Sequence, residues 1–447
     1  MNSNEILMPA LSPTMEEGGI AKWLVKEGDI IKAGDLIAEI ETDKAIMEFE
    51  STIDCTISKL LVEEGTNHIK VNTPIVKIND NHNPLPIKNL NTENDKKNKS
   101  KKIINTQNDV HDIKFEKNEN LKILTVREAI RDALAEEMRA DENVFLMGEE
   151  VAEYQGAYKV SQGLLDEFGS KRVIDTPITE HGFTGLAAGA AFGGLKPVVE
   201  FMTFNFSLQA MDQIINTCAK TLYMSGGQMN CPIVLRGPNG AASQVAAQHS
   251  QDFAPWFASI PGLKVIQPFS ANDAKGLLKS AIRDPNPVIF LENEILYNDK
   301  SASSEIRDEL IPIGKANILI EGTDVSIISY GIGIKHSLMA IELAKDINIS
   351  VELIDLRSLR PIDYKTVFES IKKTNRCITV EECFPVCSIG NHLSASIMEN
   401  VFDYLDSPVI NCTGKDVPMP YAKNLELAAL ITPEEIFEKI KKVTNSD

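Results

Sequence analysis

Residues 172–201 read RVIDTPITEHGFTGLAAGAAFGGLKPVVEF, and this stretch decides the fold of the larger part of the chain. The run at 172–177 predicts a strand, and the run at 197–201 predicts another. Between them, residues 185–194 are nearly all Ala and Gly. Such small residues let neighbouring backbones approach closely, so we expect a buried helix there. Strand, helix and strand in this order are typical of an α/β fold.

The same alternation continues on both sides of this stretch, across residues 121–447. Upstream, Thr125 is suited to cap an amphipathic helix at about 125–140, and a strand is expected at 144–148. Downstream, the pattern predicts strands at 231–236, 263–267 and 287–291, then, after a polar gap at 298–308, at 325–330, 351–355 and 377–381. The sequence therefore predicts two α/β domains, at 121–298 and 309–441.

The N-terminal region, residues 3–79, contains an internal repeat. Residues 26–40 resemble residues 63–78, and each copy reads as short strands separated by Gly turns. Two copies predict a flattened β-sandwich or barrel with approximate two-fold symmetry. Between the copies, alternating apolar residues at 37–49 predict a hairpin with Asp43 and Lys44 at its tip.

Residues 80–120 form the third region, and their composition is polar. Residues 81–120 include ten Asn and eight Lys. Such a segment buries too little apolar surface to offset the entropy lost on ordering. We expect it to be a flexible linker.

Composition excludes several classes of partner and location. The net charge of −19 argues against nucleic acid, which binds clustered cations. No apolar run reaches the roughly 20 residues of a membrane span. The seven cysteines are odd in number and scattered, as in a reducing compartment. Residues 1–13 lack Lys and Arg and resemble neither a secretory signal nor an Arg-rich transit peptide, so we expect a cytoplasmic protein, or one already in its mature form.

Two candidate functional residues have ordinary interpretations when each is taken alone. Glu180 directly precedes the small-residue helix, where a carboxylate is stabilised by the helix N-terminus. Lys44 is a lysine at a hairpin tip, and most such lysines are only solvated. The motifs around both residues point to more specific roles.

The motifs around Lys44 resemble the lipoyl/biotinyl domain family over residues 3–79. ETDKA at 41–45 matches the lipoylation signature, and MPALSPTMEEG at 8–18 matches the start of such domains. Biotinyl domains usually carry Met-Lys-Met at the tip, which this sequence does not. The resemblance implies a lipoyl group on Lys44, able to accept an acyl group and two electrons.

The larger region, from about 122 to 440, resembles the beta subunits of 2-oxoacid dehydrogenases, a transketolase-like family. The resemblance rests on GEEV at 148–151, GAYKV at 156–160, DTPITE at 175–180, EFMTFNF at 200–206, RGPNG at 236–240, AQHSQ at 247–251 and DVPMPYA at 416–422. It is nearest to the pyruvate-specific branch. It implies a transketolase-like pyrimidine-binding domain, then a transketolase C-terminal-like domain.

The resemblance also assigns roles around thiamine diphosphate. Glu180 would contact the aminopyrimidine ring as an acid and base acting on the cofactor. Met202 and Phe206 would pack against that ring, and Ile178 would contact it through its backbone. For two further residues, the role implied by the resemblance and an ordinary structural role have about equal weight. Glu149 matches a carboxylate of an acidic tunnel and is otherwise a strand-end charge, and His249 matches a proton donor at the site's mouth and is otherwise structural.

A potassium site is implied in the same way. The residues that match its ligands are Ile233, Ala281, Ile282, Asp284 and Asn286. The last four lie where a helix end runs into a Pro-locked turn, at which free carbonyls cluster. The alternative is a simple capped turn.

One expected motif is missing. Thiamine-diphosphate enzymes hold magnesium and diphosphate with a Gly-Asp-Gly segment, and this sequence has none. Within the resemblance, an alpha subunit must supply that side of the cofactor. This implies an obligate heterotetramer of two alpha and two beta subunits. The further partners implied are a dihydrolipoamide acyltransferase core and lipoamide dehydrogenase.

The expected function is oxidative decarboxylation of pyruvate with acetyl transfer to lipoamide. Two alternatives stay open. The substrate could be a branched-chain 2-oxoacid or acetoin, or the chain could be a non-catalytic carrier tethered to a structural body. An intact Glu180 argues against the second alternative.

Overall fold

The computed structural model describes residues 5–9, 17–32, 35–41, 46–51, 55–71, 73–79, 122–241, 244–307 and 309–445. The chain divides into two compact units, Met1–Asn118 and Glu119–Asp447. The whole of the predicted linker, residues 80–120, and the tip residue Lys44 lie outside the described residues. In the part of the chain that the structure describes, no helix is long and apolar enough to cross a membrane.

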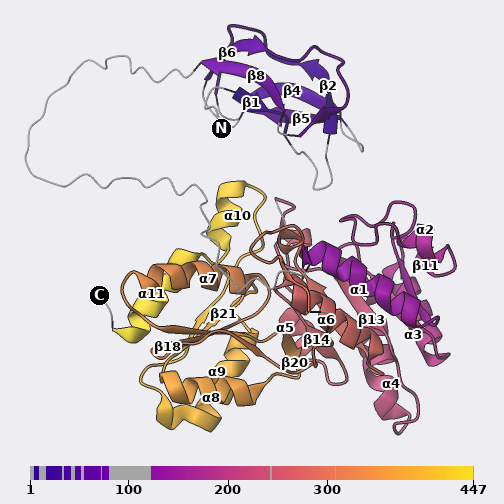
Figure 1. The fold of residues 1–447 in the computed structure, drawn as a ribbon, viewed down its shortest axis with the longest axis vertical. Coiled ribbons are helices and arrows are strands. Elements are labelled where there is room, and N and C mark those ends of the chain that lie inside the picture. The colour runs from indigo at the N-terminus through magenta and orange to yellow at the C-terminus, as the bar shows by residue number, and fades with distance from the viewer. Residues whose placement is uncertain are drawn as a thin grey trace, which may run out of the picture. The chain divides into compact units, whose positions relative to one another are not determined.

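The N-terminal unit is the flattened β-sandwich that the repeat predicts (Figure 1). Its two four-stranded sheets have the orders β1-β8-β6-β3 and β5-β4-β2-β7. Adding four to each strand number, and counting on from β8 to β1, converts the first order into the second. The two-fold symmetry is therefore confirmed. The strands are β1 (Glu5–Leu7), β2 (Glu17–Trp23), β3 (Ile30–Ile31), β4 (Leu36–Glu41), β5 (Ile46–Glu50), β6 (Cys55–Leu60), β7 (Ile69–Lys70) and β8 (Pro74–Asn79).

The predicted hairpin consists of β4 and β5. The two strands are antiparallel, and Glu41 pairs with Ile46 at the last position before the tip. Side chains such as Ile20, Ile37, Ile57 and Ile75 fill the space between the two sheets. The buried isoleucines fix the register of the strands, because a slip of one residue would turn them toward water.

The C-terminal unit begins with a seven-stranded sheet in which six neighbouring strands are parallel. Strand β20 closes one edge and runs antiparallel to β14. The order across the sheet is β11 (Val173–Asp175), β10 (Val144–Gly148), β12 (Lys196–Glu200), β13 (Val234–Pro238), β15 (Val288–Glu292), β14 (Lys264–Ile266) and β20 (Ser358–Arg360).

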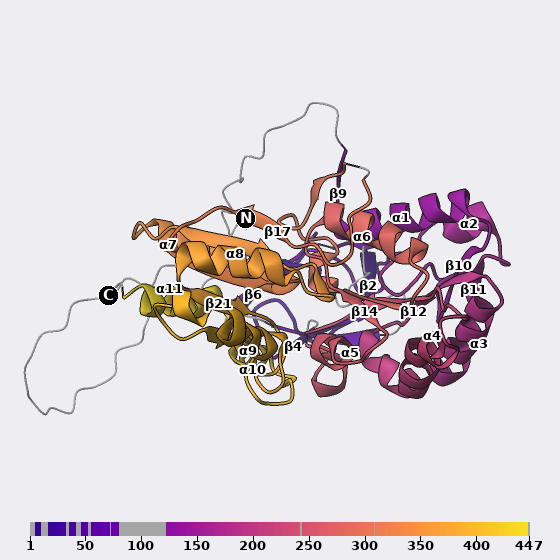
Figure 2. The ribbon, with the colours of Figure 1, turned by 90° about the horizontal axis from the view of Figure 1, so that it is seen from below.

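Helices cover both faces of this sheet (Figure 2). The α1 helix (Val126–Ala140) and α6 (Ala271–Arg283) lie on one face, and α3 (Glu180–Phe192), α4 (Ala219–Met224) and α5 (Ala254–Ala258) on the other. Alternate residues of each strand enter separate cores, so Leu146 packs on the α1 side and Met147 on the α3 side. The predicted cap is confirmed, since Thr125 and Glu128 form a capping box at the start of α1.

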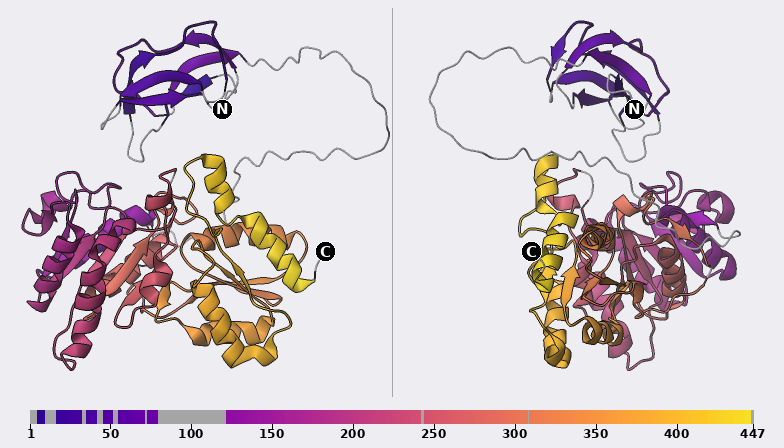
Figure 3. Two further views of the ribbon diagram at one scale, coloured as in Figure 1. Left: turned by 180° about the vertical axis from the view of Figure 1, so that it is seen from behind. Right: turned by 60° about the vertical axis from the view of Figure 1, so that its left-hand side comes forward.

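A five-stranded sheet follows, with α7 and α11 on one face and α8 and α9 on the other (Figure 3). Its order is β17 (Asn317–Ile320), β19 (Val351–Asp355), β18 (Val325–Ser329), β21 (Cys377–Val380) and β22 (Ile410–Cys412). Its helices are α7 (Ile332–Lys345), α8 (Tyr364–Thr374), α9 (Ile389–Val401) and α11 (Pro433–Thr444). The remaining elements are β9 (Ile123–Leu124), α2 (Leu164–Phe168), η1 (Phe204–Ala210), η2 (Gln213–Cys218), η3 (Ala247–His249), η4 (Glu294–Leu296), β16 (Ser304–Glu305), η5 (Phe402–Tyr404) and α10 (Lys423–Ala429).

Two details of the prediction are wrong. The strand expected at 231–236 begins only at Val234, because Pro232 cannot donate to a sheet ladder. The small-residue helix begins at Glu180, five residues earlier than predicted, and it is buried on only one side. Phe183, Ala187 and Ala191 pack inward, but Leu186 is 68% exposed in this chain. Small residues thus mark the packed part of the helix, and they do not mark its start.

Candidate active site

The candidate site residues follow four neighbouring strands of the seven-stranded sheet. Glu149 follows β10, Glu180 follows β11, Phe206 follows β12 and His249 follows β13. The strands lie in the order β11-β10-β12-β13 and are parallel, so their carboxyl ends meet at one edge. From β10 the chain passes first to β11 on one side and then to β12 on the other. Ligands of such sheets bind at the carboxyl edge where the order reverses.

Glu149 and Glu180 form a buried carboxylate pair at this edge. Glu149 is 5% exposed and Glu180 is 9% exposed. Oε1 of Glu149 has no hydrogen-bond partner among the described residues. Burial, and then the charge of Glu180, raise the pKa of Glu149 to about 7. Two close carboxylates resist ionising together, so Glu149 retains a proton for part of the time near neutral pH.

Glu180 is the first residue of α3, a position that its backbone makes favourable for negative charge. The N-cap residue Thr179 makes no side-chain hydrogen bond to the helix. A carboxylate here is therefore stabilised by the helix while it stays close to Glu149. The arrangement can hold a proton and exchange it with a basic ring nitrogen placed against Glu180.

The other predicted ligand contacts also follow the carboxyl ends of these neighbouring strands. The ring centroids of Phe206 and His249 lie 5.4 Å apart with an interplanar angle of 80°, so the edge of one ring meets the face of the other. Met202 and Phe206 are half-buried, and His249 is exposed. Ile178 is 83% exposed in this chain.

His181, next to Glu180, is turned toward another helix. Its Nε2 lies 3.3 Å from the side-chain amide nitrogen of Gln213 in η2. This contact orients the ring. His181 stays without an assigned function.

The residues predicted to bind potassium gather at the opposite, amino edge of the sheet. Two of their backbone carbonyls already accept hydrogen bonds: that of Ala281 from the Asp284 amide (3.2 Å) and that of Ile233 from the Val288 amide (2.9 Å). The Asp284 carboxylate pairs with Lys264 and accepts from the Asn286 amide (2.9 Å). A carbonyl has two lone pairs and could still serve an ion. These contacts neither require nor exclude an ion, so the potassium site stays a prediction.

Sequence reasoning missed a buried charge network beneath the site. Arg236 in β13 is fully buried and pairs with Glu200 at the end of β12 and with Glu292 at the end of β15. The Tyr297 hydroxyl also donates to Glu292 (2.6 Å). A signal was present, because Glu200 and Glu292 end apolar strands that are otherwise buried.

The fold and this edge define a transketolase-type protein with a fused domain of the biotin/lipoyl type. Three family models match the chain: "Biotin-requiring enzyme" at residues 4–78, "Transketolase, pyrimidine binding domain" at 122–300 and "Transketolase, C-terminal domain" at 314–436. The solved structure of a split-gene transketolase, described as an inactive beta4 tetramer, is similar with a TM-score of 0.61. It is 21% identical and covers 72% of this chain and 98% of its own, which supports the fold alone.

Comparison with curated relatives identifies the family within the transketolase-type proteins. The chain is 56% identical to the pyruvate dehydrogenase E1 component subunit beta of Rhizobium meliloti, over 98% of this chain and 99% of that protein. It is 59% identical to the Rickettsia bellii protein of the same name over 72% of this chain and 98% of that one, and 57% identical to the mitochondrial yeast protein over 72% and 89%. The chain belongs to the family of pyruvate dehydrogenase E1 beta subunits.

Proposed function

We propose that this chain is the pyrimidine-binding half of a thiamine-diphosphate-dependent pyruvate dehydrogenase, working in the bacterial cytoplasm. The observation that carries the proposal is the Glu149–Glu180 pair at the carboxyl edge of the sheet. The reaction would be oxidative decarboxylation of pyruvate and transfer of the acetyl group to lipoamide. The alternatives are a branched-chain 2-oxoacid or acetoin as substrate.

The residues at this edge fit the aminopyrimidine part of thiamine diphosphate. Glu149 presents a buried carboxylate oxygen without a partner, and Phe206 and Met202 offer half-buried aromatic and thioether surface. When bound, the cofactor supplies the carbon nucleophile and the electron sink that the loss of CO2 requires. Glu180 holds and returns a proton at a ring nitrogen, and Glu149 shares that proton with it. His249, exposed beside Phe206, delivers a proton at the mouth of the site.

The diphosphate and magnesium side of the cofactor would come from an alpha subunit. This chain lacks a Gly-Asp-Gly segment, and the proposal places each active site at an interface within a heterotetramer of two alpha and two beta subunits. The acyltransferase core and lipoamide dehydrogenase would then complete the acetyl transfer.

The proposed function predicts activity only in the assembled enzyme. We expect this chain, co-expressed with an alpha subunit that carries Gly-Asp-Gly, to release CO2 from pyruvate when thiamine diphosphate and magnesium are present. Either subunit alone should be inactive, because each holds only one side of the cofactor. If branched-chain 2-oxoacids or acetoin were turned over faster than pyruvate, the substrate assignment would change to that compound. No turnover of any 2-oxoacid would refute the proposed enzyme.

Lys44 is proposed as the lipoyl attachment site, on the hairpin formed by β4 and β5. Lys44→Arg keeps the charge but cannot form the lipoyl amide, so we expect the lipoyl mass to disappear from the intact protein. Mass spectrometry of chain from lipoylation-competent cells measures this directly. Lys77→Arg, at an exposed position on β8, is the control and should keep the modification. A wild-type chain that stays unmodified in such cells contradicts the assignment.

A further inference from the structure

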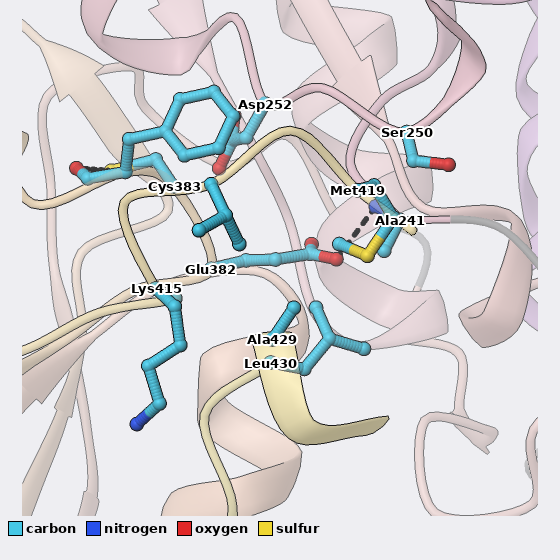
Figure 4. Close-up of a pocket in the computed structure, with 12 residues that line it drawn as sticks. Ala241, Ser250, Asp252, Glu382, Cys383, Lys415, Met419, Ala429 and Leu430 are labelled. Atoms are coloured by element: carbon cyan, nitrogen blue, oxygen red, sulfur yellow. Dashed lines mark hydrogen bonds between the residues drawn. The ribbon is translucent and has the colours of Figure 1, made fainter. Parts of the chain in front are cut away.

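The segment that carries His249 is held from outside its own domain. We name residues 239–241 and 244–253 the His249 segment. Two carboxylates of the C-terminal domain accept hydrogen bonds from its backbone. The Ala241 amide donates to Oε1 of Glu382 (2.7 Å), as Figure 4 shows, and the Gln244 amide donates to Oε2 of Glu426 (2.8 Å). The His249 segment therefore depends on the C-terminal domain for its placement.

The Glu382 carboxylate fits closely against this backbone. Gly240 has a φ of +92°, and a Cβ added there would lie 2.3 Å from Oε2 of Glu382. The side-chain amide of Asn293 donates to the same oxygen (3.3 Å). Glu382 also lines a small cavity, together with Ala241, Ser250, Asp252, Lys415 and Met419 (Figure 4). The contact is thus specific, and both a glycine and an acceptor are needed to make it.

A short series of hydrogen bonds connects this contact to the candidate active site. The Gly240 amide, next to Ala241, donates to the Gln251 carbonyl (3.0 Å). The Gln251 amide donates to Oδ1 of Asn205 (3.2 Å), and Asn205 directly precedes Phe206. Phe206 in turn packs edge-to-face with His249. A shift of Ala241 would therefore reach both ends of the Phe206–His249 contact.

The charges around Glu382 favour its neutral form. Burial, and then the charges of Asp252 and Glu294, raise the pKa of Glu382 to about 8, although the bond from Ala241 acts in the opposite direction. Asp252 has a pKa of about 6, raised mainly by its own burial. Lys415 also lines the cavity, but its ammonium group pairs with Glu435 and points away from Glu382 (Figure 4). Near pH 7 most Glu382 is protonated, so a glutamine there is a close mimic.

We propose that Glu382 is a positioning residue for His249, acting through the Ala241 amide. This inference rests on the proposed function, in which His249 delivers a proton during the reaction. The C-terminal domain would then do more than complete the fold, because it fixes the distance from His249 to the carboxylate pair. Loss of the acceptor at 382 would release the His249 segment without touching a reacting atom.

The test uses the enzyme assembled with its alpha subunit and follows acetyl transfer to lipoamide. Glu382→Ala should lower kcat by up to about 10²-fold, because small misplacements of catalytic groups have effects of this size. Glu382→Gln keeps the acceptor and should stay near wild type at pH 7. Glu438→Ala, at a 64% exposed side chain in α11, is the control for the same domain and should change nothing.

A double-mutant cycle separates positioning from general damage. The double variant Glu382→Ala/His249→Ala should have nearly the same kcat as His249→Ala alone, since both substitutions remove the same function. The inference would be overturned if the fold-reductions in kcat of the two single variants multiplied in the double variant. Wild-type activity in Glu382→Ala would overturn it as well. If Glu382→Ala fails to assemble, hydrogen exchange in the purified chain decides, because the Ala241 amide should exchange faster than in wild type. Unchanged exchange there overturns the inference as well.

Failure of the proposed function gives a different result. In that case the wild-type assembly does not turn over pyruvate, or His249→Ala has wild-type activity. The exchange experiment still reports on the contact between Glu382 and Ala241. The two hypotheses can therefore fail separately.

Discussion

Glu180→Gln is expected to reduce pyruvate decarboxylation by about 10²–10⁴-fold, the usual contribution of a positioned acid or base. Glutamine preserves the size and hydrogen-bonding capacity of the side chain, but it cannot take up or release the proton. Glu180 is buried at the start of α3, so no water substitutes easily for the lost group. The measurement is steady-state CO2 release by the assembled enzyme at saturating thiamine diphosphate.

The matched control is Glu369→Gln, the same change at a 65% exposed side chain of α8. It should leave the rate unchanged. Glu180→Gln should also lower the pKa of Glu149, because it removes one of the two causes that raise that pKa. Infrared titration of the Glu149 carboxyl measures this shift. An unimpaired Glu180→Gln enzyme would remove Glu180 from the mechanism.

Much of the fold could be predicted because local pattern and tertiary structure agree. The strand expected at 144–148 is β10, residue for residue, and Thr125 caps α1 as predicted. Strands β17, β20 and β22 were missed. Each has only three or four residues, and each lies at or near a sheet edge, where pairing depends on distant segments. A short stretch of sequence does not show which distant strand it will pair with.

The candidate site could be predicted only in part, for the same reason. Motifs placed Glu149, Glu180 and His249 after strands, but adjacency of the two carboxylates requires β10 and β11 to be neighbours in the sheet. Nothing in the sequence near Glu382 indicates that it contacts Ala241, which lies 141 residues away. Contacts across that separation follow from the packing of two domains. They are visible only once both sheets are in place.

The second large effect concerns the network beneath the site. Nε and Nη2 of Arg236 bond to the two carboxylate oxygens of Glu292, both at 2.5 Å, and Nη1 bonds to Glu200. The network ties together the carboxyl ends of β12, β13 and β15. Met202 and Phe206 come after the end of β12, so the network anchors the strand end that leads to them.

Arg236→Met should lower the free energy of unfolding by about 3–5 kcal/mol, the usual result of removing one partner of a buried ion pair. The cause is the uncompensated burial of Glu200 and Glu292, and it outweighs the lost attraction itself. Urea unfolding of the full chain, followed by circular dichroism, measures the change. Arg139→Met removes an equally bidentate pair, with Glu167, whose side chains are 55% and 40% exposed, and it should barely move the transition. Equal losses in the free energy of unfolding for Arg236→Met and Arg139→Met would show that burial of the ion pair does not determine the loss of stability. Replacing Arg236, Glu200 and Glu292 together by apolar residues should restore much of the stability, because no charge is then left unpaired.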